Sequence, residues 1–282
     1  DQRNMVQPAL INFNLFNMKR YTILYIICSF LLFLSACEKN AIDYGDIQKI
    51  GPEVPLIKLN YASLYNDNRF AIIKFNGRRV TSLIQGRTPF PGGGYNTYGD
   101  VRADYLTVDP GQVKLTVALP YKVDIGLDSV ELYSTTINIE QGKKYVAHIT
   151  DTAAFTKTVL TEESFAKPDS GYATYRFINL MPNVPAIDLY YGQSANVVTA
   201  DKLVASNISY LKISDYFTIN RASARTWKIR PAGAAVTNAT VIANYTSAST
   251  LLNQRTYTIY ALGYNGITTV PRKPYLSFFH IR

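Results

Sequence analysis

The fold is decided by a short stretch that occurs twice, first as Asp104-Tyr105-Leu106-Thr107-Val108 and again as Asp215-Tyr216-Phe217-Thr218-Ile219. About forty residues further along the chain, each copy is followed by a second shared pattern, Gly-Lys-Lys-Tyr ending at Tyr145 and Gln-Arg-Thr-Tyr ending at Tyr257. The separation between the acid and the final tyrosine differs by only one residue between the copies. Self-similarity at this spacing predicts two related units in tandem, each of roughly a hundred residues.

The composition agrees with two globular β domains. A chain of 282 residues is long enough for about two domains, and 47% hydrophobic with 17% charged residues is an ordinary globular balance. The 22 Tyr and 13 Phe favour strands over helices. The net charge of +9 is scattered, and no run of Lys and Arg exceeds three residues. A nucleic-acid surface needs clustered basic residues, so we expect no nucleic-acid partner.

The first unit is expected over residues 54–161. A strand over 70–75 ends at the turn pair Asn76-Gly77, and the apolar residues of 113–119 alternate with polar ones, as in a half-buried strand. We expect residues 134–139 and 145–149 to form a hairpin, and residues 155–160 to close a sheet. Residues 162–171, which contain Pro168, are the expected linker.

The second unit is expected over residues 172–282. Residues 175–179 match 57–61, and residues 186–192 match the strand that ends at Gly77. A second hairpin is expected between 240–248 and 257–261, with a final strand over 275–280. Many short strands with Gly, Pro and Asn turns predict an all-β fold: two tandem antiparallel Ig-like β-sandwich domains after a lipoprotein signal peptide.

The N-terminal residues form a sorting signal. Residues 18–36 read as a lipoprotein signal peptide: a basic start at Met18-Lys19-Arg20, an apolar run over 21–33, and the box Leu34-Ser35-Ala36 before Cys37. The pattern resembles the bacterial lipobox, which predicts lipidation of Cys37 and attachment to the cell outer membrane, periplasmic or surface-exposed. Residues 1–17 are an expected over-extension of the gene, and residues 37–53 are an expected tether. The alternatives are an uncleaved anchor helix or a Cys that follows the apolar run by chance.

Five stretches of the second unit resemble the domain-of-unknown-function family 4397 (DUF4397). They are 175–182 (Tyr-Arg-Phe-Ile-Asn-Leu-Met-Pro), 185–190 (Pro-Ala-Ile-Asp-Leu-Tyr), 207–210 (Asn-Ile-Ser-Tyr), 216–219 (Tyr-Phe-Thr-Ile) and 231–233 (Pro-Ala-Gly). The first unit departs from the pattern, with Leu64 at the position of the family's proline and Ile73 near that of its aspartate. The resemblance implies an extracytoplasmic β-sandwich module of Bacteroidota-type lipoproteins, without known catalytic residues.

The segment 89–99, within the longer connection 87–99, is the candidate binding loop. Phe90, Tyr95 and Tyr98 lie among Gly and Pro, where their rings are placed to stack on a sugar or a partner side chain. The alternative is a loop folded over the sandwich edge with these aromatic rings buried. Two acids, Asp100 and Asp104, lie at the end of this loop and are too few for a calcium site.

Little in the sequence indicates catalysis or a bound metal. The two histidines, His148 and His280, fall within expected strands, where packing is their usual role. Cys28 leaves with the signal peptide and Cys37 carries lipid, so no thiol remains for a metal or a nucleophile. Ser129 and Thr152 follow Asp and precede an apolar residue, a short pattern that resembles O-glycosylation sites and also arises by chance.

The function expected from the sequence is a lipid-anchored, non-catalytic binding or adhesion module of the cell envelope. Its expected partners are the membrane, through the lipid, and a glycan or protein ligand, with no cofactor and no metal. One alternative is a structural or assembly component of a surface complex. The other is a carbohydrate-active hydrolase that uses acids near the segment 89–99.

Overall fold

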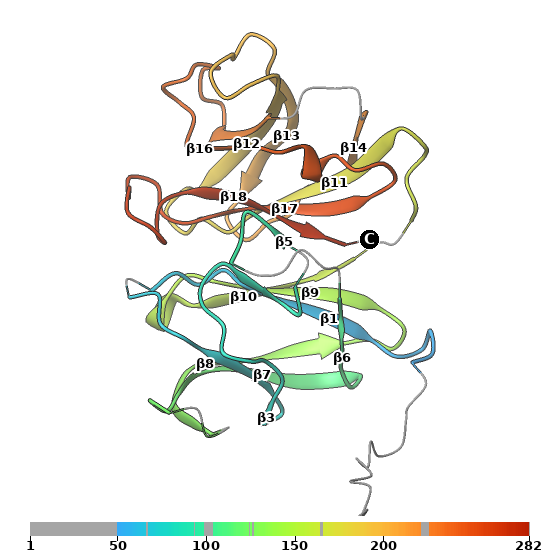
Figure 1. Cartoon of the computed structure of the whole chain (residues 1–282), viewed down its shortest axis with the longest axis vertical. Helices are drawn as coiled ribbons and strands as arrows, with labels where there is room; N and C mark the ends of the chain where they lie inside the picture. Colours follow the sequence, from blue (N-terminus) through green and yellow to red (C-terminus); the bar gives the residue numbers. More distant parts are fainter. Residues whose placement is uncertain are drawn as a thin grey trace, which may run out of the picture. The chain divides into compact units, whose positions relative to one another are not determined.

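The computed structural model describes residues 50–65, 67–92, 94–98, 104–123, 125, 127–163, 166–220 and 226–281 (Figure 1). Residues 50–282 form one compact unit. The expected signal peptide, Cys37, most of the tether and Asp100 lie outside the described residues. Among the residues that are described, no helix is long and apolar enough to cross a bilayer.

The first repeat contains two sheets. Its strands are β1 (Leu56–Tyr61), β2 (Ile72–Phe75), β3 (Arg78–Arg79), β4 (Thr88–Phe90), β5 (Gly94–Tyr95), β6 (Leu106–Thr107), β7 (Gly111–Pro120), β8 (Asp128–Ile139), β9 (Lys144–Thr150) and β10 (Lys157–Glu162), with a 3₁₀ turn η1 (Ala153–Phe155). Inner sheet 1 has the order β10-β9-β1-β4, with β6 also paired to β1, and outer sheet 1 has the order β3-β2-β7-β8. An apolar cluster that includes Ile57, Leu115 and Ile149 joins these sheets.

The second repeat has the same plan. Its strands are β11 (Tyr172–Asn179), β12 (Ala186–Gly192), β13 (Lys202–Ser209), β14 (Phe217–Asn220), β15 (Thr226–Pro231), β16 (Ala243–Thr246), β17 (Thr256–Leu262) and β18 (Tyr275–His280), with a 3₁₀ turn η2 (Ala248–Thr250). Inner sheet 2 has the order β14-β11-β17-β18-β5, and outer sheet 2 has the order β13-β12-β15-β16. Its core is aromatic, with Trp227 in contact with Tyr175 and Phe278.

The all-β prediction is confirmed, but the sheets are not wholly antiparallel. In each repeat the first strand pairs in parallel with the strand that carries the second shared pattern, so Ile57 lies beside Tyr145 and Tyr175 beside Tyr257. The duplicated stretch pairs with the first strand as well, through β6 and β14. The repeat found in the sequence is therefore a repeat in space.

Both predicted long hairpins are wrong. β8 lies in outer sheet 1 and β9 in inner sheet 1, so the turn between them crosses from one sheet to the other. β16 and β17 are separated in the same way in the second repeat. Alternation of apolar residues marks each strand as half-buried, but it does not say which sheet the strand joins. The predicted Asn76-Gly77 turn is confirmed, with φ of +47° and +84° at its two residues.

A third apolar cluster, the inter-repeat core, joins the two inner sheets. It consists of Ala62, Leu64, Val146, Ile178, Leu180, Tyr260, Leu262, Tyr275, Phe279 and Ile281. The strands that contribute to it also contribute to the core of their own repeat through alternate residues: on β17, Ile259 faces the second-repeat core and Tyr260 the inter-repeat core. Both faces of the inner sheets are therefore buried.

Candidate binding surface

The segment 88–98 passes from the first repeat to the second. β4 pairs with β1 of inner sheet 1, and β5 then pairs with β18 of inner sheet 2, with Tyr95 opposite Phe278. Gly94 permits this close approach, since a Cβ at that position would lie 2.8 Å from the Pro89 Cγ and 3.2 Å from the Phe278 carbonyl oxygen. A segment that reads as a loop in the sequence thus extends the sheet of the other repeat.

Asn96 and Arg87 fix the end of this segment. The Asn96 backbone has φ of +56°, its side-chain amide donates to the Leu276 carbonyl over 2.7 Å, and its own carbonyl accepts from the Ser277 hydroxyl over 3.0 Å. The Arg87 guanidinium donates to the same carbonyl over 2.5 Å. It also lies 3.7 Å from the ring centroid of Tyr275 and 4.6 Å from that of Tyr98. These contacts hold the segment against β18.

The three aromatic residues of the candidate loop do not form one group. Phe90 is half-buried against the core of the first repeat, whereas Tyr95 packs on the core of the second, with its ring centroid 6.1 Å from that of Tyr257. Tyr98 is 48% exposed and is the outermost of the three. Of the three, Tyr98 offers the most surface to a ligand, and their joint action in binding stays a prediction.

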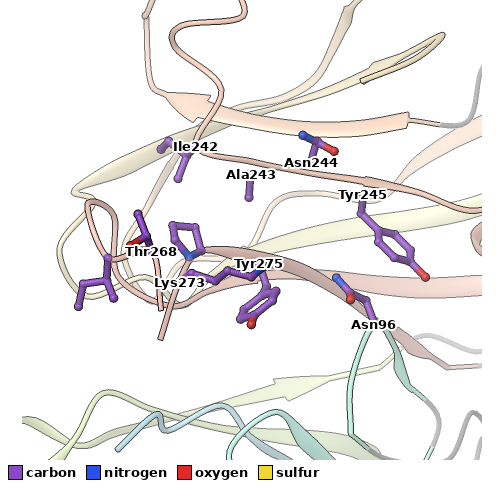
Figure 2. Close-up of a pocket in the computed structure, with 10 residues that line it drawn as sticks. Asn96, Ile242, Ala243, Asn244, Tyr245, Thr268, Lys273 and Tyr275 are labelled. Carbon is purple, nitrogen blue, oxygen red and sulfur yellow. The ribbon is translucent and has the colours of Figure 1, made fainter. Parts of the chain in front are cut away.

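A shallow hollow of about 520 Å³ lies beside this segment (Figure 2). Its lining comes from the end of β5, from β16 and from the residues before β18: Asn96, Ile242, Ala243, Asn244, Tyr245, Ile267, Thr268, Lys273, Pro274 and Tyr275. Figure 2 shows Asn96 beside Tyr245 and Tyr275, although Asn96 belongs to the first repeat and the two tyrosines to the second. The hollow is therefore assembled from both repeats.

The described residues of the lining offer hydrogen-bonding groups and ring surface, and none of them is a carboxylate. Asn96, Asn244 and Thr268 supply amides and a hydroxyl, and Tyr245 and Tyr275 supply rings. The Lys273 ammonium lies 5.3 Å from the ring centroid of Tyr275, and burial raises the pKa of Tyr275, which keeps its phenol neutral. Such a surface suits a neutral or anionic ligand with many hydroxyl groups.

A second hollow, of about 450 Å³, lies on the first repeat. It is lined by Asp67, Arg69, Phe70, Leu83, Leu119, Pro120, Tyr121 and Lys122. Of its two cations, Arg69 is already neutralised, because it donates to both oxygens of Asp67 over 2.9 and 2.6 Å, and Lys122 is the other. The described lining of the first hollow contains no carboxylate, whereas Asp67 lines the second, so the first hollow is the better candidate for an anionic ligand.

Other predicted residues lie apart from the hollow. Ser129 is exposed on β8, with its hydroxyl donating to the Pro120 carbonyl over 3.0 Å. Thr152 is half-buried, and its N–H donates to the Asp151 carboxylate over 2.8 Å. Asp104 is exposed before β6. Within the described part of the chain, no group of three or more His, Cys, Asp or Glu is placed to hold a metal ion.

The structure also contains a buried polar cluster between the inner sheets that sequence reasoning missed. Glu163, the second residue of the expected linker, is buried and paired with Arg176, and it accepts from Thr161 over 2.9 Å and from Thr258 over 3.3 Å. His148 is fully buried nearby, and its Nδ1 lies 2.9 Å from the amide nitrogen of Asn60. Burial, and then the charge of Arg176, lower the pKa of His148 to about 3. This cluster fixes the two repeats together.

One part of this lining, the turn around Lys273, has a recognisable pattern in the sequence. Pro271-Arg272-Lys273-Pro274 is a basic turn flanked by prolines just before a strand. Nothing in the sequence predicts that this turn lies near Asn96, because Lys273 and Asn96 are 177 positions apart. That contact depends on β5 pairing with β18.

Comparison with known families gives one match. Residues 77–190 match the family described as Domain of unknown function (DUF4397). The matched segment runs from the Asn76-Gly77 turn to β12, so it lies mostly in the first repeat, whereas the sequence resemblance was placed in the second. No curated protein matches the chain.

Proposed function

Residues 77–190 of this chain belong to the DUF4397 family, and from that premise we propose that the protein is a non-catalytic binding module of the cell envelope. The ligand we propose is a neutral or anionic glycan held in the hollow beside Asn96. The observation that carries the proposal is the lining itself: its described residues combine ring surface, amides and one ammonium and include no Asp or Glu.

Binding rather than hydrolysis is favoured by the same lining. Acid–base cleavage of a glycosidic bond uses two carboxyl groups that flank the bond. Among the residues that the structure describes, those around the hollow supply no carboxyl group, and the described acid nearest in sequence to the segment 88–98, Asp104, is not among them. A glycan held here would be retained rather than cleaved.

The proposed location is the outer membrane, with the protein anchored through lipid on Cys37. The basic start, the apolar run over 21–33 and the box before Cys37 support it. We also assign the two repeats to tandem Ig-like sandwiches behind this signal. Intact mass of the native protein beside a Cys37→Ala variant tests the anchor, because acylation adds mass only to the former.

A glycan panel tests the ligand. The Asn244→Ala and Lys273→Ala variants each remove an exposed side chain from the hollow, so the fold is retained. Loss of a hydrogen bond or of the charge should weaken binding about tenfold, which isothermal titration resolves. The Tyr121→Ala variant at the second hollow is the matched control and should bind as the native protein does.

Two outcomes would overturn the proposal. One is the absence of binding by every neutral and anionic glycan tested. The other is equal weakening by Tyr121→Ala and Lys273→Ala, which would place the ligand outside the hollow beside Asn96.

A further inference from the structure

One sheet edge of this molecule is long and carries little protection. β8 is the last strand of outer sheet 1, and its partner in the sheet order is β7. It has twelve residues, and the run from Leu132 to Ile139 contains no charged residue and no proline. An uncharged, extended edge offers its backbone N–H and C=O groups to another strand.

The other edges are protected in recognisable ways. β3 and β5 have two residues each, β4 has three, and β14 and β16 have four. β10 has six residues, with Lys157 at its start and Glu162 at its end. β13 begins with Lys202, pairs with β12 through shifted registers, and bends at Asn207, whose φ is +53°. Short length, charge and bulges all prevent edge-to-edge pairing, so β8 stands out.

The regular part of β8 is the part near its end. From Tyr133 to Ile139 each residue pairs with β7 in one unbroken register, whereas the shift between Val117 and Ala118 interrupts the earlier part. The turn η1 contacts β8 as well. Because β8 leads into β9 through residues 140–143 and η1 follows the end of β9, we infer that this contact lies toward the start of β8. The segment 133–139 is therefore the flat portion of the edge.

The contacts of Lys114 show which backbone groups face outward. Its carbonyl accepts from the Asn76 N–H, and its N–H donates to the Asn76 side chain, each over 2.9 Å, so both groups point toward β2. Lys114 is paired with Thr136 of β8. In an antiparallel pair, the backbone N–H and C=O groups of two opposed residues either point at each other or both point away. Since those of Lys114 point away from β8, the N–H and C=O of Thr136 point away from β7, to the free edge. Ser134 and Asn138 follow by alternation.

We propose that this edge pairs with the same edge of a second copy of the chain. The register that satisfies the outward groups places Thr136 opposite Thr136 of the other copy, and Ser134 opposite Asn138. A two-fold axis then passes between the two Thr136 residues, and outer sheet 1 continues from one copy into the other.

The side chains fit this self-pairing on both faces. On the inner face Tyr133 would lie beside Ile139 of the other copy and Thr135 beside Ile137, which continues the apolar core, since Ile137 and Ile139 are buried in it. On the outer face, Thr136 and Asn138 are exposed polar residues that would meet Thr136 and Ser134. Thr–Thr cross-strand pairs are favourable, and no like charges are placed opposite one another.

The test is a charge exchange at the two-fold axis, made on the full chain in mild detergent. Sedimentation over about 1 to 500 µM brackets the Kd expected for a small interface. Thr136→Lys places two ammonium groups opposite each other, and Thr136→Asp places two carboxylates opposite each other, so each variant alone should be monomeric. An equimolar mixture of the two should dimerise again, which a misfolded variant would not do.

The control is Gln112→Lys, which adds the same charge to an exposed position of the interior strand β7 and should leave the dimer intact. A native chain that stays monomeric throughout the concentration range would overturn the proposal. A dimer that is insensitive to Thr136→Lys, or a mixture of the two variants that remains monomeric, would overturn it as well, because the contact would then lie elsewhere.

Discussion

Lys58 and Arg176 occupy the same position in the two repeats, and their surroundings differ. Each is the second residue of its aligned segment, 57–61 on β1 or 175–179 on β11. Each also lies over the tyrosine of the duplicated stretch, Lys58 at 4.8 Å from the Tyr105 ring and Arg176 at 4.9 Å from the Tyr216 ring. The Arg176 guanidinium also forms an ion pair with the Glu163 carboxylate. The ammonium of Lys58 instead donates to the His280 carbonyl over 2.9 Å.

The difference shows how a buried cation is accommodated with and without a carboxylate. An arginine stays charged and needs its partner, so the repeat that carries Arg176 depends on Glu163. A lysine can release its proton, and burial lowers the pKa of Lys58 to about 7, against the opposing charges of Asp104 and Glu163. Arg176 is therefore held in a fixed ion pair, and Lys58 is a titratable group.

The largest expected effect is the loss of the partner of Arg176. Glu163→Ala leaves a guanidinium in a buried site with no carboxylate, which should lower the free energy of unfolding by about 3–5 kcal/mol. Urea unfolding of the two proteins at the same pH measures this difference. Glu162→Ala removes the neighbouring exposed carboxylate and should leave the midpoint unchanged, so an equal loss in both variants would contradict the assignment.

His148 should make stability depend on pH below neutrality. Its pKa falls from 6.5 to about 3 on folding, so between these values the unfolded chain binds more protons and stability decreases as the pH falls. The loss from pH 6.5 to pH 4.5 should be about 2 kcal/mol. His148→Gln should reduce the pH slope in this window, and His280→Gln should not; equal slopes in all three proteins would contradict this account.

Lys58 should make stability depend on pH above neutrality, in the same direction. The unfolded side chain keeps its proton up to about 10.5 while the folded one releases it near 7, so stability should rise by about 2 kcal/mol from pH 8 to pH 10. Lys58→Met retains the apolar stem and should abolish this rise. A rise of the same size in the Lys58→Met protein would assign it to another group.

The smallest expected effect separates the two stacked tyrosines. Replacing either ring by leucine removes a cation–π contact worth about 1 kcal/mol. At pH 9 the Tyr105→Leu cost should shrink, because Lys58 is then neutral, whereas the Tyr216→Leu cost should not change, because Arg176 remains charged. Chemical unfolding at pH 7 and pH 9 compares them, and parallel behaviour of the two variants would argue against the distinction.

The strands were predictable because the signals for them are local. The duplicated Asp-Tyr stretch, the Asn76-Gly77 turn and the alternation over 113–119 each depend on neighbouring residues, and β10 and β18 were also expected. Asp188 has local partners of the same kind, since its carboxylate accepts from the N–H groups of Asn207 and Gly233 over 2.7 and 2.9 Å. Sheet membership and parallel pairing depend on the whole chain and were not predictable.

The buried cluster and the hollow were missed for one physical reason. Lys58, Asn60 and His148 alternate with core residues, and a polar alternate face ordinarily faces water. Here the inner sheet of the other repeat covers that face. The contact of Asn96 with the second repeat has the same origin, since Gly94 lets β5 join β18. No local pattern indicates that one repeat will bury another.

The central claim is that the two repeats form one cooperative unit, and thermal unfolding followed by two probes tests it most directly. Trp227 is the only tryptophan of the chain and lies in the second-repeat core, so its fluorescence reports that repeat, whereas far-UV circular dichroism reports the strands of both. We predict a single transition with the same midpoint by both probes. A circular-dichroism transition without any change in Trp227 fluorescence would show that the first repeat unfolds alone, and would contradict the claim.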